Sequence, residues 1–69
     1  MAWAERYLRE AEARIKLGKQ HIECQRQAIA ELEQACRDAT AARELLRTTE
    51  SLQALRIERF KQLRREVAA

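Results

Sequence analysis

The sequence of 69 residues has no proline, one glycine and three aromatic residues. Domains built on strands and tight turns normally require glycine, proline and aromatic or β-branched residues, so this composition excludes them. The chain is instead rich in Ala, Leu, Arg, Glu, Gln and Lys, which lose little side-chain freedom in a helix. Its 46% hydrophobic residues argue against disorder despite 36% charged residues. We therefore expect one all-α domain spanning residues 1–69.

Long apolar runs are also missing. No segment approaches the ~20 apolar residues of a membrane span, and the N-terminal MAWAERYLRE carries charges where a signal peptide needs its apolar stretch. The two cysteines, Cys24 and Cys36, would lie about 18 Å apart on a continuous helix, which is too far for a disulfide. Free thiols suit a reducing compartment, so the expected location is the cytoplasm.

A heptad repeat organises the first half of the chain. One seam position recurs every seven residues from Leu8 to Cys36, and a second recurs from Ala4 to Leu32. This alternation indicates a helix over about residues 3–36 that packs in the manner of a coiled coil, with Cys36 as a small hydrophobe beside the turn.

The heptad register fails in the second half, where it would place Arg43 and Glu50 in the seam. Asp38 follows the break and is suited to cap a new helix. The sequence therefore predicts a turn at residues 37–39, a second helix over about residues 40–67, and an antiparallel hairpin. One continuous helix about 100 Å long is the alternative, because neither glycine nor proline marks the turn.

The two predicted helices should meet along a seam in which large residues face small ones. Gln25 is expected near Gln53, and Gly18 should allow Ile57 and Phe60 to approach closely. The predicted core seam comprises Leu8, Ile15, Gly18, Ile22, Gln25, Ile29, Leu32, Leu45, Leu52, Phe60, Leu63 and Val67.

Two helices of this length bury little apolar surface alone, so a partner is implied. The large apolar residues of the second helix sweep about 200° of its circumference, which suits a helix that touches two others. The sequence thus favours a homodimer in which two hairpins form a four-helix bundle.

Arg56 lies near the centre of that apolar arc. Either its aliphatic stem packs while the guanidinium reaches water, or it joins a buried polar layer with a residue such as Gln53. His21 lies at the edge of the seam and is a further candidate for partner contact.

Charge is divided unevenly along the predicted hairpin. Residues 1–19 and 56–69 hold ten Lys and Arg against five Glu, about +5, whereas residues 20–55 hold four Arg against six acidic residues, about −2. Four basic residues near the C-terminus are candidates for anion contact, namely Arg59, Lys61, Arg64 and Arg65. A basic hairpin dimer that binds nucleic acid is therefore the alternative function, although no recognition motif accompanies the charge.

Motifs for catalysis or cofactor binding are weak. His21 and Cys24 share a helix face, but zinc requires three or four protein ligands, and neither a glycine-rich phosphate loop nor a catalytic arrangement is present. We expect no enzymatic activity, no metal and no cofactor.

Two spaced motifs resemble those of small uncharacterised helical proteins of rhizobia and related proteobacteria, a group without an established activity. They are Gly18-x-x-His21-Ile22-x-x-Gln25-Arg26 and Asp38-x-x-x-Ala42-Arg43-Glu44-Leu45-Leu46. The resemblance implies a free-standing intracellular bacterial protein. The group has glycine and histidine where this chain has Cys36 and Arg37. The resemblance itself implies no activity. The heptad periodicity, the wide apolar arc and the weak catalytic motifs lead us to expect a non-enzymatic module for helical oligomerisation or protein interaction.

Overall fold

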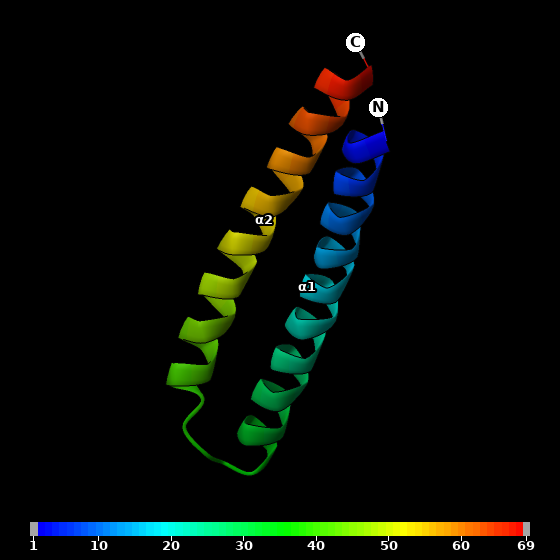
Figure 1. Cartoon of the computed structure of the whole chain (residues 1–69). Coiled ribbons are helices and arrows are strands. Elements are labelled where there is room, and N and C mark those ends of the chain that lie inside the picture. The colour runs from blue at the N-terminus through cyan, green and yellow to red at the C-terminus, as the bar shows by residue number, and fades with distance from the viewer. Residues whose placement is uncertain (1, 69) are drawn as a thin grey trace.

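The computed structural model describes residues 2–68 and shows a helical hairpin (Figure 1). Helix α1 spans Ala2–Gln34 and helix α2 spans Thr40–Ala68, and the described part of the chain contains no strand. The helices run antiparallel and pack along their lengths, so the start of α1 and the end of α2 lie at one end of a rod measuring 53 × 15 × 11 Å between Cα atoms. The predicted all-α hairpin is confirmed, and the alternative of one continuous helix is wrong.

The connection between the helices begins two residues earlier than predicted, because α1 ends at Gln34. Cys36 has a φ of 55°, the left-handed conformation that usually falls to glycine after a helix. The backbone N–H of Arg37 donates to the carbonyl of Leu32 at 2.8 Å, and that of Cys36 donates to Glu33 at 3.0 Å. These two bonds form a Schellman motif, which stops the helix without glycine.

Helix α2 begins where Asp38 caps the chain. Its Oδ1 atom accepts hydrogen bonds from the Thr40 hydroxyl at 2.6 Å and from the Thr40 backbone N–H at 3.0 Å. These bonds, the side-chain one first, hold the pKa of the Asp38 carboxyl below its usual value, with a smaller contribution from the positive charge of Arg43. Asp38 therefore caps α2 as its sequence position indicates.

The turn also sets the rotation of α2. Ala39 is buried, and its carbonyl accepts the first helical hydrogen bond, from Arg43 at 2.9 Å. Steps of three and four residues from Ala39 bring one stripe of α2 against α1. The buried or half-buried members of this stripe are Ala42, Leu46, Thr49, Gln53, Ile57, Phe60 and Leu63.

The predicted seam is wrong for three residues of α2. Leu45, Leu52 and Val67 are 57%, 48% and 39% exposed and do not lie between the helices. For Leu45 and Leu52 the physical reason is the rotation imposed at Ala39, which turns Gln53 inward in place of Leu52. Val67 continues the inner stripe four residues after Leu63, but it lies in the last turn of α2 at the open end of the hairpin. The other nine predicted seam residues are buried or half-buried, namely Leu8, Ile15, Gly18, Ile22, Gln25, Ile29, Leu32, Phe60 and Leu63.

Polar contacts across the seam fix the register of the two helices. The Gln25 amide donates to the Thr49 hydroxyl at 3.1 Å, and the Gln53 amide donates to the Ile15 carbonyl at 2.7 Å. Gln25 therefore meets α2 about one turn from the predicted position beside Gln53. The side chain closest to Gly18 is Gln53, not Ile57 or Phe60 as predicted.

Candidate interaction surface

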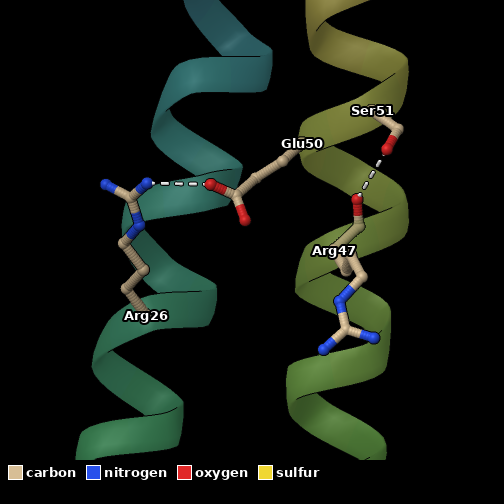
Figure 2. Close-up of polar contacts among 4 residues, drawn as sticks. All are labelled: Arg26, Arg47, Glu50 and Ser51. Atoms are coloured by element: carbon tan, nitrogen blue, oxygen red, sulfur yellow. Dashed lines mark hydrogen bonds and ion pairs between the residues drawn. The ribbon is translucent and has the colours of Figure 1, made fainter.

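The two long faces of the hairpin carry different chemistry. On one face, the Arg26 guanidinium reaches across to the Glu50 carboxylate at 3.0 Å (Figure 2), and Arg43 lies 3.4 Å from Glu33. We call these four residues the ion-paired face. Their side chains are about half exposed, so each pair contributes at most about 1 kcal/mol. This face satisfies its charges within one chain.

Helix α2 adds a local bond beside this face. Figure 2 shows the Ser51 hydroxyl donating to the carbonyl of Arg47 within the same helix, at 3.1 Å. Thr48 and Thr49 make the same kind of bond, to Glu44 and Leu45 respectively. These hydroxyl groups thus donate within their own helix, and the Thr49 hydroxyl also accepts from Gln25 of α1.

The other long face carries exposed apolar side chains. Leu45 and Leu52 lie on the same side of α2 as Arg56 and Leu63, because the spacings of seven, four and seven residues complete whole turns. Leu17 of α1 and Arg56 of α2 border the same surface hollow. We define the apolar face as Trp3, Tyr7 and Leu17 of α1 with Leu45, Leu52 and Leu63 of α2. Five of these six side chains are about half exposed or more, and Leu63 is half-buried.

Two adjacent hollows lie along the apolar face. The larger, about 540 Å³, lies towards the open end and is bordered by Trp3, Tyr7, Phe60 and Leu63. The smaller, about 340 Å³, is bordered by Leu17 and His21 near the middle of the hairpin. Arg14 and Arg56 border both hollows, so the two are adjacent, and we refer to them together as the groove, whose open end is aromatic.

The polar-layer candidates occupy different places. Gln53 is 7% exposed and lies between the helices, whereas Arg56 and His21 are exposed and border the groove. The buried polar layer therefore consists of Gln25 and Gln53, and Arg56 extends to the surface. Within residues 2–68, the Oε1 atoms of Gln25 and Gln53 are buried without a hydrogen-bond donor. Such atoms cost free energy in the single hairpin.

The four candidate anion-contact residues do not form one basic surface. Arg59 borders the larger hollow, Lys61 lies 3.9 Å from Glu58, and Arg64 stacks over the Phe60 ring at 5.4 Å from its centroid. Arg65 is exposed and lies about 120° around α2 from Arg59. Their charges therefore point in several directions.

The two cysteines lie in different parts of the hairpin. Cys24 is exposed on α1, and Cys36 is exposed at the turn, so the expected seam position of Cys36 is wrong. Its left-handed conformation ends α1 before the side chain can continue the heptad stripe. In the described range 2–68, no three His, Cys, Asp or Glu side chains gather as metal ligands would.

The sequence prediction did not select Trp3, Tyr7 and Leu17, which are exposed on the apolar face. These residues flank the heptad seam and do not belong to it, so core periodicity gives no reason to select them. One feature of the sequence could have identified them. Trp3, Tyr7 and Leu17 lie on one flank of the heptad seam, whereas the other flank carries Arg26 and Glu33.

Over the described residues, neither helix combines the length and apolar content needed to cross a bilayer. Comparisons of the chain with models of protein families, with curated proteins and with solved structures find no match. The surface itself therefore carries the functional conclusion.

Proposed function

We propose that this chain is a non-enzymatic self-association module in which two hairpins pack through their apolar faces into a four-helix bundle. The observation that carries the proposal is the contrast between the faces. Arg26 and Glu50 pair within one chain, whereas Leu17, Leu45 and Leu52 extend into solvent from both helices. Exposed apolar side chains that gather on one face of a small protein are typical of a protein interface.

The surface area of the hairpin supports this proposal. The chain exposes 5821 Å², whereas a compact protein of 8.1 kDa exposes about 4,500 Å². The excess of about 1,300 Å² exceeds the roughly 800 Å² that each partner buries in a standard interface. A second hairpin would cover an area of this size.

The interior of the single hairpin is also small. Ile29 is the one large hydrophobic side chain that is buried in the described part of the chain, and Ala4 and Ala39 are the other buried apolar residues. Chains of this length rarely reach a stable fold on one small core. Packing on the apolar face would bury further leucine and aromatic side chains and so stabilise each hairpin.

Two measurements test the proposal: the mass of the protein in solution, and the dimer dissociation constants of two matched variants. Multi-angle light scattering and sedimentation equilibrium should give twice the chain mass for the wild type. Leu52→Glu places a charge in the apolar face and should raise the dissociation constant at least about tenfold, since burying a leucine side chain is worth about 1.5–3 kcal/mol.

Ala54→Glu is the control, because Ala54 is exposed and lies about 200° around α2 from Leu52. It should leave the dimer intact. A monomeric wild type, or equal weakening by both substitutions, would contradict the proposal.

A further inference from the structure

The larger hollow of the apolar face indicates how a second copy is oriented. We propose that the two hairpins pack antiparallel, with Leu45 of each copy entering the larger hollow of the other. This inference rests on the proposed self-association, and it adds the direction of packing and the residue that fills the hollow.

The charge distribution supports the antiparallel direction. The open end of the hairpin carries about +5 and the turn half about −2. An antiparallel partner places each basic end over an acidic half, whereas a parallel partner brings two +5 ends together. Opposite potentials across an interface favour association and like potentials oppose it, so the antiparallel pair is preferred.

The register of the helices places Leu45 at the hollow. The contacts of Gln53 with Ile15 and Gly18 mark the middle of the hairpin. Leu45 lies eight residues from Gln53, about 12 Å towards the turn. In an antiparallel pair centred on Gly18 and Gln53, this leucine arrives about 12 Å towards the open end of the partner.

A point about 12 Å from the middle of the hairpin, towards its open end, lies within the larger hollow. Ala11 and Tyr7 precede Gly18 by seven and eleven residues, about 10 and 16 Å, and both border that hollow. The arriving Leu45 therefore meets an aromatic wall made by Tyr7 and Phe60. Leu45 is 57% exposed in the single hairpin, so its burial there is a large gain.

A parallel pair lacks this complementarity. The two larger hollows would face each other at the open end, and both Leu45 side chains would meet near the turn. Neither Leu45 side chain would then reach the larger hollow of its partner, about 540 Å³, so the apolar contact of Leu45 with Tyr7 and Phe60 would be lost.

The relative direction of the two hairpins in the dimer can be measured with a spin label. The label is attached to Cys36, the native cysteine at the turn, in a Cys24→Ser chain. Both cysteines are exposed, so this substitution leaves one accessible thiol. Dipolar spectroscopy on an antiparallel dimer should give a label separation close to the 53 Å length of the hairpin. A separation of roughly 20 Å, about two helix spacings, would overturn the antiparallel direction while leaving self-association standing.

Sedimentation of the labelled chain separates the two proposals. A monomer would overturn self-association and the orientation with it. A dimer with the short distance overturns the orientation alone.

The occupant of the hollow is tested by Leu45→Ala beside Leu55→Ala. Both leucines are on α2 and similarly exposed, but Leu55 lies about 200° around the helix from Gln53, away from α1. Leu45→Ala should raise the dissociation constant of the dimer roughly tenfold or more, and Leu55→Ala should leave it nearly unchanged. Equal effects of the two substitutions would overturn the assignment of Leu45 to the hollow.

Discussion

At the scale of single residues, Gly18 and Gln53 form the most specific contact between the helices. Gln53 inserts its amide between them, donates to the Ile15 carbonyl, and lies directly against Gly18. A β-carbon at position 18 would meet the Gln53 Oε1 atom and lie 2.9 Å from its Cδ atom. The glycine is thus required by a neighbouring side chain, since its own backbone conformation is that of an ordinary helix.

Gly18→Ala should therefore destabilise the hairpin although alanine is the better helix former. The gain in helix propensity is about 1 kcal/mol, but displacing Gln53 removes a hydrogen bond worth about 1 kcal/mol and leaves a buried amide unpaired at about 1–3 kcal/mol. We expect a net loss of about 1–3 kcal/mol in the free energy of unfolding, measured by urea denaturation.

The double substitution provides the control. In a Gln53→Ala background the obstruction is gone, so Gly18→Ala should become stabilising by up to about 1 kcal/mol. If Gly18→Ala has the same effect in both backgrounds, the contact with Gln53 does not account for the glycine.

At the scale of the elements, the sequence predicts the two helices well and the contacts of α2 poorly. The heptad repeat from Leu8 to Ile29 identifies the inner stripe of α1, because each step follows from helix geometry. The inner stripe of α2 depends on the turn, where Cys36 adopts a left-handed conformation that no local propensity indicates. If the inner stripe of α2 began one residue earlier at the turn, Leu52 would lie in the seam in place of Gln53.

Cys36→Gly should stabilise the end of α1. A residue with a side chain costs roughly 1–2 kcal/mol in the left-handed conformation, and glycine avoids this cost while losing somewhat more freedom on folding. The expected gain is about 0.5–1 kcal/mol, seen as a higher thermal midpoint. Cys36→Ala removes the thiol but keeps the strain, so an equal gain from alanine would refute this explanation.

The start of α2 should show a dependence on pH that originates from Asp38. The folded pKa of this carboxyl lies below its usual value, so its contribution to stability is present above the unfolded pKa and is lost as pH falls through the folded pKa. Urea unfolding across acidic pH should show wild type losing stability relative to Asp38→Asn.

Asparagine is the matched variant at position 38, because its side-chain oxygen can still accept from Thr40 but does not titrate. A stability difference between the two chains that stays constant across acidic pH would exclude Asp38 as the source. An NMR titration of the carboxyl reports its pKa directly.

At the scale of the whole molecule, the single turn between the helices explains why the ion-paired face and the apolar face lie on different sides of the hairpin. Arg26 and Glu33 flank the seam of α1 on one side and Leu17 on the other, and the antiparallel return of α2 places Arg43 and Glu50 beside the first pair. The hairpin could be predicted from composition and periodicity. The side of the hairpin on which the exposed apolar side chains lie could not, because it depends on the rotation of both helices.

The position of the chain reversal also determines the order in which contacts can form. Residues beside the turn, such as Glu33 and Arg43, are ten apart in sequence, whereas Gln53 and Ile15 are 38 apart. Closing a short loop costs less entropy than closing a long one, so folding should begin at the capped turn and extend towards the termini. The aromatic end of the groove is then the last part of the hairpin to assemble and the first to open.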